Sequence, residues 1–166
     1  MMALPDLPTA GGSSVEVLDP GGVLSAADVG WLVGRTAEAL GVLGAGGSVS
    51  VKVVGDVEMA GAHGRWLGVA ETTDVLTFDL GSDPAVGGVH ADMLVCFEQA
   101  KREGAQRGHE ARQELLLYII HGILHCLGHD DQDEAGYVRM HAEEDRVLRA
   151  MGVGMTFARP AGGGGA

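Results

Sequence analysis

The chain has 166 residues, of which 46% are hydrophobic, and its formal net charge at pH 7 is −12. This length is enough for one domain with a hydrophobic core and too short for two. Sequence-independent binding to nucleic acid depends mainly on Lys and Arg that neutralise phosphates, so the acidic charge argues against a general DNA or RNA binder. No DNA partner is expected, and an RNA partner requires a local basic patch.

Neither a membrane-spanning helix nor an export signal is readable in the sequence. No apolar run approaches about 18 residues, which is the length that a membrane span needs. The N-terminal letters MMALPDLPTAGGSS contain neither a positive start nor the apolar region of a secretory signal. We therefore expect a cytoplasmic protein with no membrane partner. Cys96 and Cys126 form no CxxC pair, which favours two buried thiols over a disulfide framework or a cysteine-rich zinc knuckle.

Both ends of the chain are poor in apolar residues. Residues 1–14 are rich in Pro, Gly and Ser, and the last seven residues read PAGGGGA. Such segments bury too little apolar surface to offset the loss of chain entropy on folding. The sequence therefore predicts a disordered segment at 1–14, one folded domain at 15–151 and a flexible, glycine-rich tail at 152–166.

Strands and helices are predicted from hydrophobic periodicity and turn residues. Four strands are expected at 15–19, 48–54, 75–80 and 90–96. Five helices are expected: one that Ser25 caps and the glycine-rich stretch 44–47 ends, a short one that Asp56 caps and that ends near Leu67, and three at 97–108, 109–127 and 134–151. This order predicts a single α+β domain in which a small mixed sheet of about four strands packs with about five helices.

The helix at 109–127 has a wide apolar stripe and is expected to be a core element. It ends in the motif HGILHCLGHDD, residues 121–131. His121 and His125 are one turn apart on one face, with Cβ atoms about 5 to 6 Å apart, so both imidazoles can reach one ion. A catalytic zinc also needs a third protein ligand and an open position. Gly128 can adopt the left-handed conformation that ends the helix and turns the chain back toward the ion.

The third ligand can come from the residues that follow this turn. The candidates are His129, Asp130 and Asp131. In zinc hydrolases whose helix motif continues through a glycine, the third ligand lies six residues after the second histidine, which is the position of Asp131. A carboxylate oxygen is an acceptable zinc ligand. The sequence therefore predicts one Zn²⁺ per chain, bound by His121, His125 and Asp131 at the end of a core helix. His129 is the alternative third ligand; otherwise it points away from the ion, or is a group beside the ligands or one that contacts the substrate.

A bare HxxxH on an apolar helix is more often a pair of histidines at the core edge than a metal site. Here the glycine at the turn and the carboxylates after it favour a metal site. Cys126 lies about 100° around the helix from His125 and is not expected to be a ligand. The other histidines have no partner at ligand spacing, and we expect surface positions for His63, His90, His109 and His141.

Three blocks of the sequence resemble the YbeY family of bacterial endoribonucleases and rRNA maturation factors, and the resemblance runs from about Val15 to Met151. TTDVLTF (72–78) is similar to the family's PTDVLSF, ADMLVC (91–96) to its GDIVIS strand, and HGILHCLGHDD to its HGxLHLLGYDH. The glycine after the first histidine, Gly122, separates the family from HExxH proteases, which carry a glutamate base there.

The resemblance implies a zinc ion held by the three ligands of the motif, a small mixed sheet with several helices, and cleavage of single-stranded RNA. It also implies work on the 3′ end of small-subunit rRNA and in ribosome quality control, with rRNA and the small ribosomal subunit as partners. Asp131 stands where the family usually has histidine, and His129 where it usually has tyrosine. Leu67 stands where members often carry an arginine. Arg65 is the candidate to supply that charge, and is otherwise an ordinary surface arginine.

Gly122 bears on the reaction as well as on the family. RNA carries its own 2′-hydroxyl nucleophile, so an RNase needs less from a protein base than a peptidase does. The missing carboxylate therefore disfavours peptide hydrolysis. The glycine also lets a neighbouring backbone come close to the helix. Besides the endoribonuclease, two functions stay open: a ribosome-associated binding factor with a structural zinc and little catalysis, and, less favoured, a metallopeptidase.

The basic residues concentrate at one place in the sequence, Lys101, Arg102, Arg107 and Arg112. These four side chains either line an RNA groove or are solvated charges that balance the acidic residues in the same region, Glu98, Glu103, Glu110 and Glu114.

Overall fold

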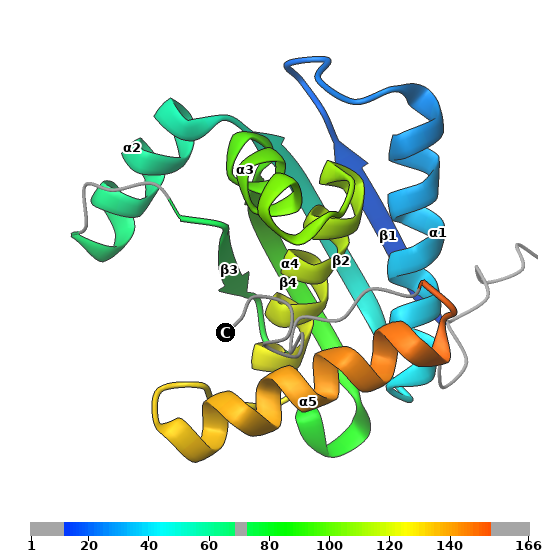
Figure 1. The fold of residues 1–166 in the computed structure, drawn as a ribbon. Coiled ribbons are helices and arrows are strands. Elements are labelled where there is room, and N and C mark those ends of the chain that lie inside the picture. The colour runs from blue at the N-terminus through cyan, green and yellow to red at the C-terminus, as the bar shows by residue number, and fades with distance from the viewer. Residues whose placement is uncertain (1–11, 69–72, 154–166) are drawn as a thin grey trace, which may run out of the picture.

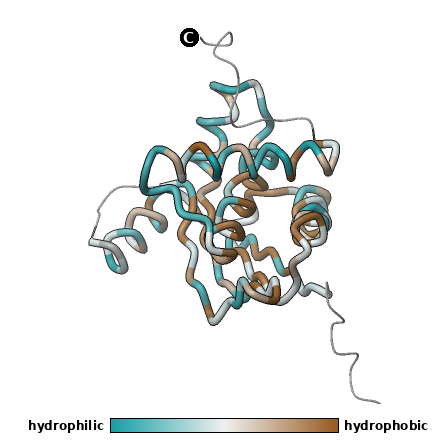
Figure 2. The backbone as a smooth tube through the Cα atoms, turned by 90° about the horizontal axis from the view of Figure 1, so that it is seen from below, coloured by the Kyte–Doolittle hydropathy of each residue, from teal (hydrophilic) through white to brown (hydrophobic). Residues whose placement is uncertain are grey.

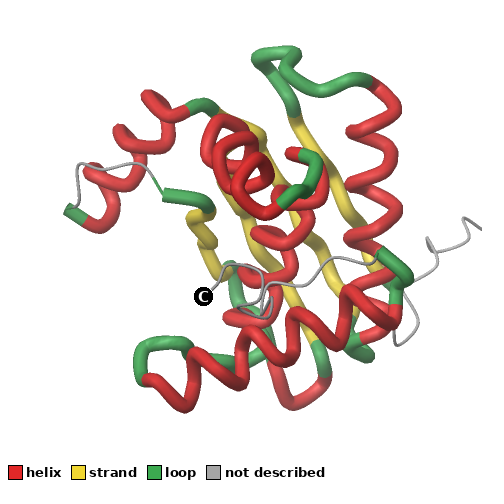
Figure 3. The backbone as a smooth tube through the Cα atoms, in the orientation of Figure 1, coloured by secondary structure: helices red, strands yellow, loops and turns green. Residues whose placement is uncertain are grey.

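The computed structural model describes residues 12–68 and 73–153, which form one sheet packed with helices (Figures 1 and 3). The strands are β1 (Ser13–Leu18), β2 (Gly46–Val54), β3 (Val75–Asp79) and β4 (Gly88–Cys96). The helices are α1 (Ala26–Val42), α2 (Asp56–Leu67), α3 (Phe97–Arg107), α4 (Ala111–Cys126) and α5 (Glu134–Ala150), and a short 3-10 helix spans Pro84–Val86. The predicted α+β fold, with a mixed sheet of four strands and five α-helices, is confirmed.

The order of strands in the sheet is β1-β2-β4-β3. β1, β2 and β4 run parallel, whereas β3 runs antiparallel to β4 and pairs Thr77 with Met93. The blocks TTDVLTF and ADMLVC are therefore neighbours in space. Within the described residues β3 is an edge strand, so one side of its backbone faces away from the sheet.

Several element boundaries differ from the expected ones for local reasons. β1 begins at Ser13, two residues earlier than expected, because it pairs with β2 from Gly47 onward. α4 begins at Ala111 because Glu110 and Gln113 form a capping box that fixes its N-terminus. Asp56 was expected to cap α2, and this is wrong. Gly55 holds the N-cap position, and the Asp56 carboxylate accepts two hydrogen bonds from Arg102 at 2.7 and 2.8 Å.

The main core lies between the sheet and the layer of α1 and α4, which α5 crosses (Figure 1). α4 is the most buried helix, because its apolar residues face both the sheet and the outer helices, and seven of them are at most 2% exposed: Leu115, Leu116, Leu117, Ile119, Ile120, Ile123 and Leu124. Figure 2 shows hydrophobic residues along these inner segments. Full burial of one such side chain stabilises the fold by about 1.5 to 3 kcal/mol, so α4 is held firmly and its C-terminal histidines have a fixed position.

The other face of the sheet is polar and largely uncovered. There Ser50 donates a hydrogen bond to Glu16 at 3.2 Å, and Ser48 lies 3.2 Å from a ring nitrogen of His90. α2 covers this face only at the β3 end, over a small cluster that includes Met59, Leu76 and other apolar residues. None of the helices in 12–68 and 73–153 is long and apolar enough to cross a membrane.

Candidate metal centre

His121 and His125 project from the C-terminal end of α4 toward the same point. Their Nε2 atoms lie 3.0 Å apart. Asp131 closes the group, with one carboxylate oxygen 3.3 Å from Nε2 of His121 and the other 3.5 Å from Nε2 of His125. In a tetrahedral zinc site with bonds of about 2.0 to 2.1 Å, neighbouring ligand atoms are about 3.3 Å apart. The three side chains therefore have the spacing that one small cation requires.

A tight turn after α4 brings Asp131 to this point. Gly128 has a φ of 94° and donates its N–H to the carbonyl of His125, and the N–H of His129 reaches the carbonyl of Leu124, both at 3.0 Å. These two bonds are the Schellman arrangement that ends helices at a left-handed glycine. Gly136, in the first turn of α5, packs on the carbonyl of Asp130 so closely that a Cβ would lie 2.1 Å from that oxygen. The loop that carries Asp131 is thus fixed at both ends.

A buried carboxylate holds the far side of the His121 ring. Oε1 of Glu144, a residue only 1% exposed, lies 3.3 Å from Nδ1 of His121. Burial opposes protonation of His121, but the hydrogen bond and the negative charge of Glu144 outweigh it and raise the pKa of the imidazole. A carboxylate at Nδ1 keeps the proton on that nitrogen, so the Nε2 lone pair is directed at the metal position.

Two cavities flank the group. One, of about 490 Å³, runs along the free edge of β3 and is lined by Thr77, Asp79, His125 and neighbouring residues. The other, of about 240 Å³, lies between α4 and α5 beside Asp131. Asp74 and His121 line both cavities. The side chain of His125 is 37% exposed, so the metal position is open to solvent on this side.

The sequence around this site also matches a known family. The family model for endoribonuclease YbeY matches residues 30–152. The chain belongs to the YbeY endoribonuclease family. A relative named endoribonuclease YbeY from Anaeromyxobacter sp. strain Fw109-5 is 34% identical over 120 residues, which cover 72% of this chain and 62% of that protein. One from Halorhodospira halophila is also 34% identical, over 66% of this chain and 74% of its own length.

A solved structure shows the same fold. The solution structure of a Thermotoga maritima protein matches 89% of this chain and 98% of its own with a TM-score of 0.55, at 22% sequence identity. At that identity the likeness supports the fold alone.

Gly122, which marks the YbeY motif, is required by packing. A Cβ at this position would lie 2.5 Å from Oγ1 of Thr77 and 2.9 Å from Cε of Met93. We had expected a neighbouring backbone to come close to Gly122. The close neighbours are instead two side chains, one from β3 and one from β4. A glutamate at position 122, as in HExxH proteases, would therefore have to displace the side chains of Thr77 and Met93.

Asp74 also lies at the site, although it is not part of the motif HGILHCLGHDD and was not among the predicted site residues. It lies in the TTDVLTF block of the YbeY resemblance, at the start of the edge strand. Its Oδ1 accepts a hydrogen bond from the N–H of Val75 at 2.7 Å, and its carbonyl accepts one from the N–H of Cys96 at 2.9 Å. These bonds fix the carboxylate beside His121. In the sequence, the role of Asp74 could have been inferred only from its position in TTDVLTF, the block that resembles PTDVLSF of the YbeY family.

Other residues singled out in the sequence do not join the metal group. His129 is half-buried and is not one of the three converging side chains. Arg65 is exposed on α2 and lines a different cavity, on the opposite face of β3. The side chain of Leu67, at the position of the frequent YbeY arginine, lies outside the described residues. Cys126 and Cys96 are both buried and form no disulfide within the described residues, and the thiol of Cys96 donates a hydrogen bond to Asp56 at 3.3 Å.

The expectation that the remaining histidines lie on the surface is wrong for two of them. His141 is 7% exposed, and its Nδ1 lies 2.9 Å from Oε1 of Glu144. The side chain of His109 is also 7% exposed, with Nδ1 3.2 Å from the fully buried carboxylate of Glu114. Both positions result from packing between helices, which their spacing along the sequence does not reveal.

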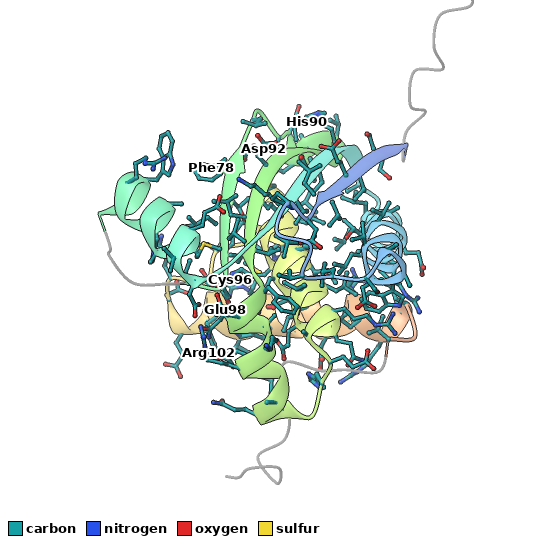
Figure 4. All side chains as sticks on the ribbon, turned by 90° about the horizontal axis from the view of Figure 1, so that it is seen from above. Phe78, His90, Asp92, Cys96, Glu98 and Arg102 are labelled. Carbon is teal, nitrogen blue, oxygen red and sulfur yellow. The ribbon has the colours of Figure 1, made fainter. Side chains whose placement is uncertain are left out.

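Three of the four clustered basic residues, Lys101, Arg102, Arg107 and Arg112, form ion pairs with carboxylates. Arg102 pairs with Asp56 at 2.7 Å, Arg107 with Glu114 at 3.0 Å, and Arg112 with Glu110 at 2.9 Å. Lys101 instead lies over the ring of Phe97, 5.5 Å from its centroid. The arrangement favours charge balance over an RNA groove at this place (Figure 4 shows Arg102 beside Glu98).

Proposed function

We propose that this chain is a zinc-dependent endoribonuclease that cleaves single-stranded RNA. It acts in rRNA processing, at the 3′ end of small-subunit rRNA, and in ribosome quality control, in the cytoplasm. The observation that carries this proposal is the convergence of His121, His125 and Asp131 at zinc-ligand spacing beside a cavity along an edge strand. Membership of the YbeY endoribonuclease family gives the substrate class.

Zinc, when bound, polarises a phosphoryl oxygen and makes water acidic enough to react near neutral pH. The residues of this chain do the remaining work. Glu144 keeps a proton on Nδ1 of His121 and so directs Nε2 toward the ion. The open side of the group, beside His125, admits the phosphodiester.

Asp74 is the group placed to accept a proton. It is the carboxylate that lines both cavities and is not one of the three ligands. Its Oδ1 is held by the N–H of Val75, which fixes the side chain while Oδ2 faces no donor among the described residues. In this role Asp74 takes the proton of the RNA 2′-hydroxyl as its oxygen bonds to phosphorus, while the bond from phosphorus to the 5′-oxygen breaks and solvent protonates that leaving oxygen. In HExxH proteases the glutamate after the first histidine takes the corresponding proton from water.

The test is cleavage of labelled single-stranded RNA by zinc-loaded protein, with His121→Ala protein and chelated protein as controls. We expect products that disappear in both controls. Equally faint products from wild type and His121→Ala would show that a contaminating nuclease made them, and the endoribonuclease proposal would fail. The alternative, a ribosome-associated factor with a structural zinc, would then remain. Digestion of casein in the same assay would instead indicate a peptidase.

A further inference from the structure

A second cavity on the opposite face of β3 has features of a nucleic-acid site. It has a volume of about 600 Å³ and lies between α2 and the outer face of β3 and β4. Its lining includes two cations, two aromatic rings and two carboxylates, namely Lys52, Arg65, Trp66, Phe78, Glu58 and Asp92. Phe78 and Asp92 are paired across β3 and β4, and Figure 4 shows both on this face.

Trp66 is unusually exposed for a tryptophan. It is 62% exposed, although an indole gains much free energy from burial. Its position is nevertheless fixed, because the ring packs edge-to-face on Phe78, with centroids 5.7 Å apart and planes at 70°. A held aromatic ring with a free face is the element on which bases of single-stranded RNA stack.

Arg65 is one of the few cations in 12–68 and 73–153 that form no ion pair with a carboxylate of those residues. Of the ten Lys and Arg within the described residues, seven form ion pairs with Asp or Glu at 4.0 Å or less. The three others are Arg65, Lys101 and Arg139. Lys101 lies over Phe97, and Arg139 lines neither of the cavities beside the metal group. Arg65 alone of the three stands beside an exposed aromatic ring in a cavity, where a phosphate would give it a partner.

The cavity and the metal group lie on the two faces of one edge strand. Thr77 lines the cavity beside the ligands, and the next residue, Phe78, lines the cavity beneath Trp66. Because no strand of the described residues pairs with the outer edge of β3, an extended strand of RNA can pass around this edge from one face to the other. A phosphate at the His121, His125 and Asp131 group and a base at Trp66 can then belong to the same RNA molecule.

We propose that the cavity between α2 and β3 binds one nucleobase of the single-stranded RNA whose scissile phosphate lies at His121, His125 and Asp131. The base stacks on Trp66, and Arg65 pairs with a phosphate next to that base. This inference rests on the proposed function, since it assigns a second contact of the same substrate. It also explains how a chain with a net charge of −12 holds a polyanion: stacking supplies affinity that does not depend on charge.

Stacking is tested with Trp66→Leu, which removes the aromatic face, and Trp66→Phe, which keeps one. The affinity for a 12-nucleotide oligouridylate is measured by fluorescence anisotropy on zinc-loaded protein, at low temperature to limit cleavage. We expect Trp66→Leu to weaken binding about 5- to 100-fold and Trp66→Phe to restore most of the loss. The exposed position of Trp66 leaves the folded state intact, which thermal unfolding verifies.

A spectroscopic signal reports the stacking directly. The chain has two tryptophans, so in a Trp31→Phe background Trp66 is the sole source of indole fluorescence. We expect the single-stranded oligouridylate to quench this emission, and an abasic oligonucleotide of the same length to leave it unchanged. Equal quenching by the abasic strand, or no quenching by either, would overturn the stacking contact.

The phosphate contact is tested with Arg65→Gln, and Arg139→Gln is the matched control because it removes the same charge from another surface. For single strands each phosphate contact contributes about 0.7 to the slope of log affinity against log salt concentration. We expect Arg65→Gln to lower the slope by about that amount and Arg139→Gln to leave it unchanged. Equal slopes in the two variants would remove Arg65 from the RNA contact.

Failure of this inference differs from failure of the proposed function. If wild type cleaves RNA in a zinc-dependent manner but Trp66→Leu binds and cleaves with unchanged KM, the cavity serves another partner and only this inference fails. If wild type neither cleaves nor binds the oligonucleotide, both fail. The supporting result is a raised KM with an unchanged kcat in Trp66→Leu.

Discussion

Glu144 Oε1 lies 3.3 Å from Nδ1 of His121, on the side of the ring that faces away from the metal position. The same oxygen lies 2.9 Å from Nδ1 of His141, so one buried carboxylate joins His121, a proposed metal ligand, to a histidine of the core. A carboxylate in this place orients the ligand and increases its basicity. The relation gives α5, which carries no ligand, a direct influence on the metal group.

The role of Glu144 is measured by zinc affinity. Glu144→Gln keeps the size of the side chain but removes its charge, and we expect zinc binding to weaken about 10- to 100-fold in competition with a chelator. Glu143→Gln is the control, because that neighbouring carboxylate pairs with Arg146 at the surface. If both variants keep wild-type zinc affinity, Glu144 does not support zinc binding through His121 and contributes only to the packing of the core.

The ligand set is decided by metal analysis of single variants. Wild type should bind one equivalent of zinc, His125→Ala none, and Asp131→Ala less than wild type, because Asp131 closes the group at 3.3 and 3.5 Å. His129→Ala should retain full zinc, since His129 is not among the three converging side chains. The reverse order for Asp131 and His129 would contradict the proposed ligands.

Substitution of Gly122 should destabilise the fold. An alanine Cβ would lie 2.5 Å from Oγ1 of Thr77 and 2.9 Å from Cε of Met93, so these packed side chains must shift, at a cost of about 1 to 3 kcal/mol in the free energy of unfolding. Gly34→Ala in α1 is the control, since its Cβ would meet no atom within 4 Å and helical alanine gains about 0.5 to 1 kcal/mol over glycine. Urea unfolding measures both, and a Gly122→Ala protein as stable as wild type would refute the packing argument.

Asp74→Asn separates proton transfer from metal binding. The amide oxygen can still accept the hydrogen bond from Val75, so the strand end should keep its shape. As a lost general base, this change should lower kcat for RNA cleavage by about 10² to 10⁴. Zinc content and thermal stability should equal those of wild type. Full activity of Asp74→Asn would show that Asp74 is not the general base and that another group accepts the proton.

Local sequence signals predicted the parts of this protein that depend on neighbouring residues. The alternation of valines gave β2, the apolar stripe gave α4, and the four-residue spacing of His121 and His125 placed both on one helix face. Gly128 was expected to turn the chain, and it does so with a φ of 94°. Each of these follows from helix period, strand period or turn conformation, which act over a few residues.

Contacts between distant segments were decided only by the tertiary structure. Glu144 reaches His121 because α5 packs across α4, and the same packing buries His141, which the sequence placed at the surface. Arg65, the candidate to replace the frequent family arginine, lies instead on the other face of β3 beside Trp66. The sequence by itself determined the metal motif, because its ligands lie within eleven residues of one helix and its turn. The partners of those ligands, and the second cavity, depend on how whole elements pack, and no local periodicity encodes that.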